Sequence, residues 1–209
     1  MKNTKLIIAM AAVLCLASCD FGKPGTYEET TNVDTVAVAV TTEADDLVMT
    51  INEKGLPGME FGSEIPETME GCTVEPVTYM AEGEEQVKYA VKKGDELVVE
   101  IEPGFDFETM EFTKTVEVIN IYSDRYQDSN DFHVGSNAND VLAAYPDLVT
   151  SLTANDDICM DLGGTQFMVS AEDYDGELPE VTSDEGALIA HPTFKPGAKV
   201  KMIRLYNTK

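Results

Sequence analysis

Near its middle the chain reads Val116-Glu117-Val118-Ile119-Asn120-Ile121-Tyr122. Apolar residues alternate there with Glu117 and Asn120, which is typical of a β-strand with one buried face. A similar stretch, Val200-Lys201-Met202-Ile203-Arg204-Leu205-Tyr206, begins 84 residues later, near the end of the chain. The two stretches predict that each half of the protein ends in a strand of the same kind.

Two further landmarks recur in the same order. Met59-Glu60-Phe61-Gly62-Ser63 resembles Phe132-His133-Val134-Gly135-Ser136, and Gly94 corresponds to Gly163 or Gly164 as a turn residue. Preserved order favours a duplicated unit over chance recurrence in a β-rich chain. We therefore expect an α+β fold made of a duplicated unit of one short helix and antiparallel strands, spanning 45–128 and 129–209.

Local patterns place the elements within these units. Helix signals are an N-cap at Ser63 with Pro66 in the first turn of a helix over 63–70, and an apolar run over 141–145 that ends before Pro146. Glycine-containing turns and β-type alternation predict the remaining strands and a long acidic loop over 171–198. The predicted strands are 47–51, 73–80, 85–92, 96–102, 148–153, 157–162 and 166–170.

A unit of this kind buries one sheet face under its helix and leaves the other face free. With Gly62-Ser63 and Gly135-Ser136 before the helices, the layout resembles the tandem units of the β-lactamase inhibitor protein and of small outer-membrane assembly lipoproteins. Pro66 departs from the spacing usual in those units. The resemblance concerns fold, and no functional residue carries over from it.

The N-terminus has a basic start, an apolar run over 6–16, and then Ala17-Ser18-Cys19. The order Leu16-Ala17-Ser18-Cys19 resembles the lipobox of bacterial lipoprotein precursors. That resemblance implies that residues 1–18 are a removable signal peptide and that Cys19 carries diacylglycerol and an acyl chain such as palmitate. Residues 19–44 would then be the lipidated cysteine with a flexible tether. The alternative is an ordinary signal peptide with a chance cysteine.

Several acyl chains hold a protein firmly on a membrane. After Cys19 no apolar run approaches the roughly twenty residues that a spanning helix needs. We therefore expect a protein of the Gram-negative cell envelope, anchored by lipid to the outer membrane. The sequence leaves open whether it faces the periplasm or the cell surface.

The formal charge is −25, and it becomes −27 when the signal peptide leaves with Lys2 and Lys5. Such acidity excludes nucleic acid as a partner. The expected partners are the membrane, through the lipid anchor, and an unknown protein, peptide or glycan ligand. The alternative to a binding role is that the acidic residues only keep the protein soluble.

Two thiols remain in the mature chain, Cys72 and Cys159. An oxidising envelope permits a disulfide between them, and two separately buried thiols are the alternative.

No catalytic constellation is present. The chain has no Gly-x-Ser-x-Gly motif, and its only histidines are His133 and His191. Acidic clusters offer weak candidates for calcium, with solvated loop acids as the alternative. The candidates are Asp124, Asp128 and Asp131 in one loop and Asp173 and Asp175 in another. Neither loop has the EF-hand spacing, and in the second loop Thr182 stands where a closing bidentate glutamate is needed.

These observations favour a lipid-anchored envelope protein that is a non-enzymatic binding or assembly module, using its free sheet face or acidic loops. Without a resident cofactor motif, calcium is the one cofactor left open. The alternatives are a surface hydrolase or calcium-dependent carbohydrate-active protein, and an inhibitor of a secreted enzyme.

Overall fold

The computed structural model describes residues 48–69, 71–81, 83–181 and 186–208. All of these lie within one compact unit, Glu43–Lys209. The predicted signal peptide, Cys19 and the tether over 19–44 lie outside the described residues, as does Thr182.

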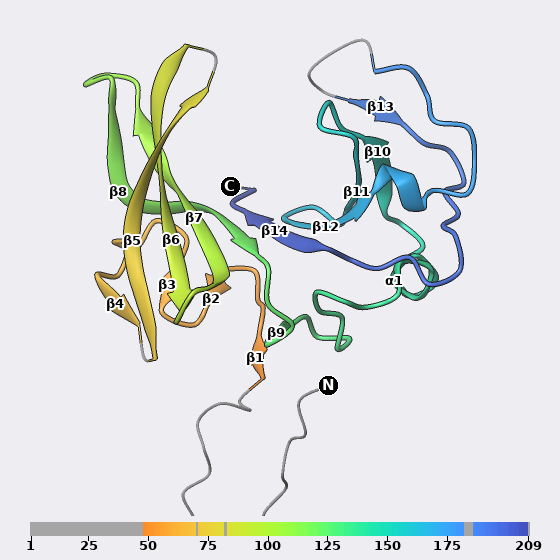
Figure 1. The fold of residues 1–209 in the computed structure, drawn as a ribbon, viewed down its shortest axis with the longest axis horizontal. Coiled ribbons are helices and arrows are strands. Elements are labelled where there is room, and N and C mark those ends of the chain that lie inside the picture. Colours follow the sequence, from red (N-terminus) through yellow and green to blue (C-terminus); the bar gives the residue numbers. More distant parts are fainter. Residues whose placement is uncertain (1–47, 70, 82, 182–185, 209) are drawn as a thin grey trace, which may run out of the picture. The chain divides into compact units, whose positions relative to one another are not determined.

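A ten-stranded sheet runs through both halves of the chain (Figure 1). Each strand pairs antiparallel with its neighbours. The order across the sheet is β13 (Ala187–Leu188), β10 (Val149–Leu152), β11 (Asp157–Asp161), β12 (Thr165–Ser170), β14 (Met202–Tyr206), β8 (Glu111–Ile121), β7 (Glu96–Asp106), β6 (Glu84–Lys93), β5 (Cys72–Ala81) and β4 (Thr68–Met69).

The two similar sequence stretches lie side by side at the centre of this sheet. Ile121 of β8 pairs with Ile203 of β14, and Ile119 pairs with Leu205. Tight turns set the register on either side. Gly94, between β6 and β7, has φ 62°, and the pair Gly163-Gly164, between β11 and β12, has φ 75° and 108°. These conformations suit glycine, so the predicted hairpin turns are confirmed.

Smaller elements accompany the sheet. Strand β1 (Met49–Thr50) pairs in parallel with β9 (Tyr126–Gln127), and β2 (Gly55–Leu56) pairs with β3 (Met59–Glu60). The helix α1 spans Ala138–Ala144, and the side chain of its N-cap Asn137 accepts a hydrogen bond from the Asn139 amide at 2.9 Å. A 3₁₀ turn occupies Ala171–Asp173.

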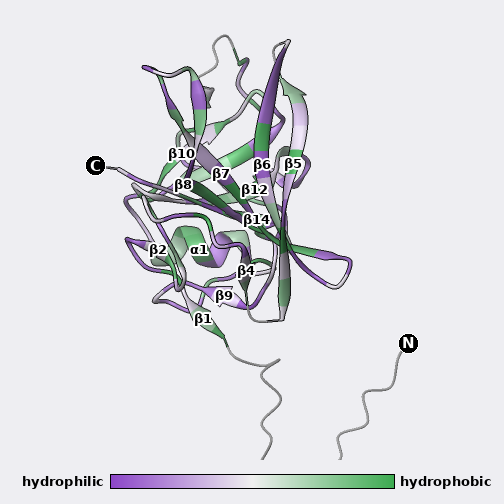
Figure 2. Cartoon of the chain, turned by 90° about the vertical axis from the view of Figure 1, so that its left-hand side faces the viewer, coloured by the Kyte–Doolittle hydropathy of each residue, from purple (hydrophilic) through white to green (hydrophobic). Residues whose placement is uncertain are grey.

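The hydrophobic core lies on one face of the sheet. Hydrophobic and hydrophilic residues alternate along its strands (Figure 2), so every second side chain reaches this core. The buried strand residues include Val99, Ile101, Ile119, Ile121, Phe167, Ile203 and Leu205. Leu56, Met59 and Val141 belong to the same cluster and bring β2, β3 and α1 against it.

The predicted helix over 63–70 is wrong. The Ile65 amide donates to the Lys114 carbonyl at 2.8 Å, and the Val116 amide donates to the Ser63 carbonyl at 2.9 Å. This segment therefore lies extended along the N-terminal part of β8, which β14 does not cover because it pairs only with residues 118–121. Ile65 is buried, and β4 follows at Thr68. Pairing with a distant strand therefore overrides the local N-cap signal, and Pro66 lacks the amide that a helix interior would need.

This segment also decides the fold class, because the α+β duplicated unit that we expected is not found. Strands make up 52% of the structure, and α1 is the only α-helix among the described residues. The described part of the first half has no counterpart of α1. The fold is β-rich and built on one continuous sheet.

The acidic segment over 171–198 is more ordered than a solvated loop. Phe194 and Ile189 are buried, and the rings of Tyr174 and Phe194 meet edge to face at 6.4 Å between centroids. Strand β13, within this segment, pairs with β10. The segment thus contributes hydrophobic anchors as well as charge; 182–185 lie outside the described residues.

Candidate binding surface

The face of the sheet opposite the core carries a row of polar side chains. Matching positions on β7, β8, β14, β12 and β11 hold one polar residue each. In order across the sheet they are Glu100, Asn120, Arg204, Gln166 and Asp161. We call this side of the sheet the polar face, and it also carries Lys88, Glu102, Val118 and Tyr206.

Two carboxylates of β7 bind side chains from three other strands, β6, β8 and β14. Glu102 accepts a hydrogen bond from Asn120 Nδ2 at 2.8 Å and one from Arg204 Nη2 at 3.2 Å. Glu100 forms an ion pair with Lys88, whose Nζ lies 2.7 Å from Oε2. Because Glu100 and Asn120 are also nearly buried, these side chains are fixed in position rather than free in solvent.

A second cluster fixes the ring of Tyr206. The Tyr206 hydroxyl lies 2.8 and 3.0 Å from the two carboxylate oxygens of Asp161, to which it donates. Gln166 Nε2 donates to the same carboxylate at 2.9 Å. Burial, and then the hydrogen bond to Asp161, raise the pKa of Tyr206, so the ring stays neutral at physiological pH.

A β-bulge brings Glu117 to this face. Glu102 pairs with Val118 and Pro103 with Val116, which leaves Glu117 without a partner on β7. An extra residue of this kind re-aims a side chain. Glu117 and Val118, although consecutive, consequently line the same pocket.

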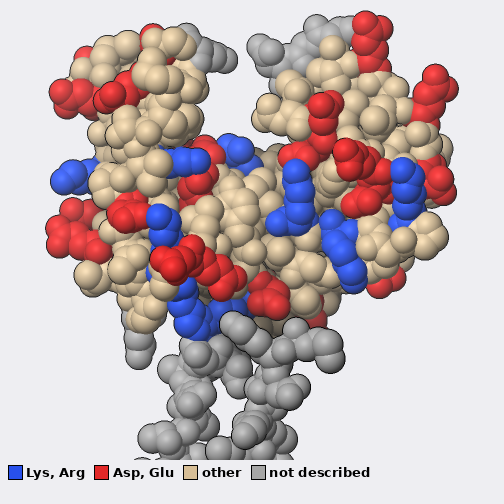
Figure 3. All heavy atoms as spheres, in the orientation of Figure 1, with Lys and Arg blue, Asp and Glu red and all other residues tan. Residues whose placement is uncertain are grey.

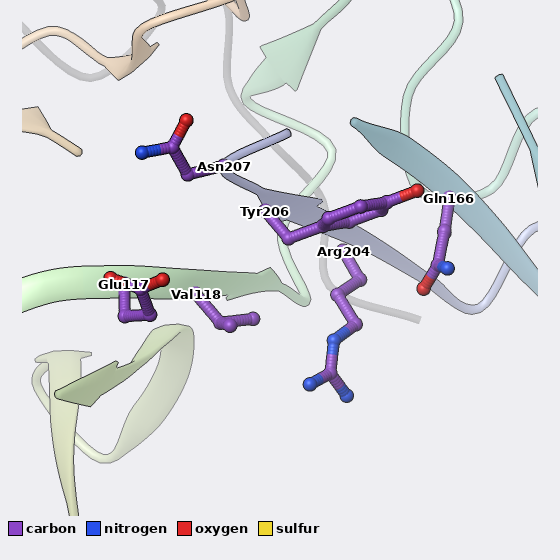
Figure 4. Close-up of a pocket in the computed structure, with 6 residues that line it drawn as sticks. All are labelled: Glu117, Val118, Gln166, Arg204, Tyr206 and Asn207. Carbon is purple, nitrogen blue, oxygen red and sulfur yellow. The ribbon is translucent and has the colours of Figure 1, made fainter. Parts of the chain in front are cut away.

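This pocket is shallow and open, with a volume of about 410 Å³ (Figure 4). Its lining residues are Glu117, Val118, Gln166, Arg204, Tyr206 and Asn207. One lining residue is basic and one is acidic, so the walls are formally neutral. Figure 3 shows basic and acidic side chains interspersed across the middle of the face that it displays. The polar-face pocket can therefore offer hydrogen bonds of both kinds without a strong net charge.

A larger hollow of about 920 Å³ lies at the ends of β1 and α1, with Asp128 and Tyr145 among its lining residues. Asp128 accepts hydrogen bonds from the Asn130 and Phe132 amides at 2.9 Å each, and one from the Tyr145 hydroxyl. Burial, and then the contact with Asp128, raise the pKa of Tyr145 to about 12. These hydrogen bonds satisfy the buried Asp128 carboxylate, so its role is structural.

The predicted calcium ligands lie in two separate loops, and within the described residues the structure does not gather three of them around one point. Asp128 is engaged as described, Asp131 accepts from Gln127 Nε2 at 2.9 Å, and Asp124 is exposed. Asp173 lies in the 3₁₀ turn, and the backbone of Asp175 pairs with Thr193. Across the ranges that the structure describes, no group of three or more His, Cys, Asp or Glu side chains is arranged to hold a metal ion.

The thiols of Cys72 and Cys159 are both free. Cys159 on β11 is buried, and burial followed by the charge of Asp161 raises the pKa of its thiol to about 12. Cys72 begins β5, which is separated from β11 by five intervening strands of the sheet. The register also puts Cys159 on the polar face, while Cys72 packs against the core. The thiols are thus held apart.

Sequence reasoning did not identify the lining of the polar-face pocket. Arg204 and Tyr206 occupy alternate positions of a stretch whose pattern predicts a strand, so the sequence indicates that both lie on one polar face. Gln166 gave no signal of its own. The bulge that re-aims Glu117 depends on pairing with β7, which local sequence does not encode.

No helix within the described ranges is long and apolar enough to cross a membrane. Neither the family models nor the curated proteins yield a match to this sequence. Among solved structures, the crystal structure of the uncharacterized protein yfeY from Escherichia coli is similar, with a TM-score of 0.51 and 13% sequence identity. The match covers 75% of this chain and 99% of that chain. At this identity the likeness concerns the fold alone.

Proposed function

We propose that this chain is a lipid-anchored protein of the Gram-negative cell envelope that acts by binding, with the polar-face pocket as its ligand site. The observation that carries the proposal is the lipobox-like order Leu16-Ala17-Ser18-Cys19 after a short apolar run. The mature protein would be held on the outer membrane through acyl chains on Cys19.

The pocket supports a binding role. Its walls come from three neighbouring strands, β8, β14 and β12, and hydrogen bonds to Glu102 and Asp161 hold Arg204, Gln166 and Tyr206. A site built on strands with fixed side chains loses little conformational entropy when a ligand binds. The acidic character of the chain favours ligands other than nucleic acid.

Membrane fractionation tests the anchor. We expect the full-length protein in the membrane fraction and the Cys19→Ala variant in the soluble envelope fraction or retained as an uncleaved precursor. Cys15→Ala, which changes a cysteine inside the predicted signal peptide, is the matched control and should behave like the parent protein. The proposal fails if Cys19→Ala leaves both location and processing unchanged.

A further inference from the structure

The polar-face pocket combines an aromatic ring with planar polar side chains. Tyr206 supplies the ring, and Gln166, Arg204, Asn207 and Glu117 supply amide, guanidinium and carboxylate groups around the same 410 Å³ space. Val118 adds an apolar surface (Figure 4). Such a lining can contact ligand carbon–hydrogen bonds on one side and several hydroxyl groups on another.

The hydrogen bonds inside the protein leave donors or acceptors available on Arg204, Gln166 and Glu117. Arg204 donates to Glu102 through Nη2. The other N–H groups of its guanidinium have no hydrogen-bond partner within the described residues. Gln166 uses its Nε2 on Asp161, and its Oε1 accepts from no described residue. The Glu117 carboxylate forms no ion pair with any described residue. The pocket therefore presents both donors and acceptors to a ligand.

Charge limits the ligand class. An anion would meet one guanidinium already bound to Glu102, with the Glu117 carboxylate beside it and a net charge of −25 on the chain. A cation would meet the Arg204 guanidinium. A peptide adding to the sheet needs a free strand edge, whereas this pocket lies on the face of central strands. A neutral ligand rich in hydroxyl groups fits these constraints.

We propose that the polar-face pocket binds one unit of a neutral saccharide, with the Tyr206 ring against a sugar face and Gln166, Arg204 and Glu117 hydrogen-bonded to hydroxyl groups. The inference rests on the proposed binding function of this pocket and names its ligand class. The position of Glu117 on the bulge matters here, because regular pairing would turn its carboxylate away from the pocket.

Calorimetric titration of the full-length protein, extracted in a detergent without a sugar headgroup, tests the inference. The probes are maltotetraose, cellotetraose and tetra-N-acetylchitotetraose, with tetragalacturonate as the anionic comparison. We expect at least one neutral tetrasaccharide to bind and tetragalacturonate to bind more weakly. Absence of binding by all three neutral probes, or tighter binding of tetragalacturonate, overturns the inference.

Variants locate the site. Glu117→Ala and Gln166→Ala should each weaken binding of the neutral probe about three- to tenfold, the effect of one lost hydrogen bond. Glu111→Ala is the matched control, since Glu111 is an exposed glutamate on the same strand outside the pocket. Tyr206→Phe keeps the ring and should retain binding, whereas Tyr206→Ala should abolish it. Unchanged binding in both Glu117→Ala and Gln166→Ala would place the saccharide elsewhere and refute the assignment.

The two proposals fail in different experiments. If the protein fractionates with membranes through Cys19 but binds none of the neutral probes, only the proposed saccharide ligand is refuted. If the protein binds a probe through Glu117 and Gln166 but Cys19→Ala changes neither its location nor its processing, only the proposed lipid anchor is refuted.

Discussion

Asp128 is the clearest case of one side chain ordering its surroundings. Its buried carboxylate accepts hydrogen bonds from two backbone amides, of Asn130 and Phe132, and from the Tyr145 hydroxyl. It thereby connects the turn after β9 to the C-cap of α1. From sequence the same residue was one of several acids in a loop. Only its partners, which lie up to 17 residues away, distinguish it.

Replacing this carboxylate should destabilise the fold. We expect Asp128→Ala to lower the free energy of unfolding by about 2–4 kcal/mol, because buried donors lose their acceptor. Asp124→Ala, which removes an exposed carboxylate from the same loop, should stay within about 0.5 kcal/mol. Urea unfolding followed by circular dichroism measures both, and equal effects of the two substitutions would contradict the role assigned to Asp128.

Alkaline pH should weaken the fold through Cys159 and Tyr145. Their folded-state pKa values are raised to about 12, from 9.0 and 10.0. A raised pKa means that the folded state favours the neutral form, so this stability is present below pH 9 and is lost as pH rises through about 12. The urea midpoint should fall over this range, and Cys159→Ala should flatten the decline. An unchanged slope in that variant would exclude Cys159 as a cause.

Among the secondary-structure elements, local patterns predicted the longer strands and their turns. β5, β6, β7, β11 and β12 lie where alternation and glycine turns placed them. Of the predicted helical run over 141–145, α1 includes all but Tyr145, which is the C-cap of the helix. The segment after Gly62 is predicted wrongly because its Ser63 and Pro66 suit a helix start as well as an extended strand. Its conformation is determined by pairing with the N-terminal part of β8, about fifty residues later in the chain, which local sequence does not reveal.

Hydrogen exchange can test the corrected conformation of this segment. The Ile65 amide donates to the Lys114 carbonyl, so we expect it to exchange slowly. The Glu64 amide, which is not a donor in these backbone pairs, is the internal control and should exchange faster. Fast exchange at Ile65 together with protection over 67–70 would instead indicate the helix.

At the scale of the whole molecule, the pairing of β8 with β14 joins the two halves. Ile121 and Ile203 are register partners and are fully buried in one core cluster. Sequence similarity between the closing stretches correctly marked two strands, but duplication was the wrong explanation for the fold. The stretches resemble each other as neighbours at the centre of a sheet, where both need the same alternation of buried and polar side chains.

A shared core predicts cooperative unfolding. Calorimetry should show one transition for the folded unit, and Ile121→Ala and Ile203→Ala should each lower its stability by about 2–5 kcal/mol without splitting it. Leu188→Ala is the control, because that side chain is 75% exposed, and it should have little effect. Two separate transitions, one sensitive to each core substitution, would show that the halves are independent domains.

The proposal that Cys19 anchors this protein is tested most directly by mass spectrometry of the protein purified from membranes. We predict a mature chain that begins at Cys19 and carries diacylglycerol with an additional acyl chain on that residue. A chain that begins at another residue, or an unmodified Cys19 thiol in the membrane-derived protein, would contradict the account.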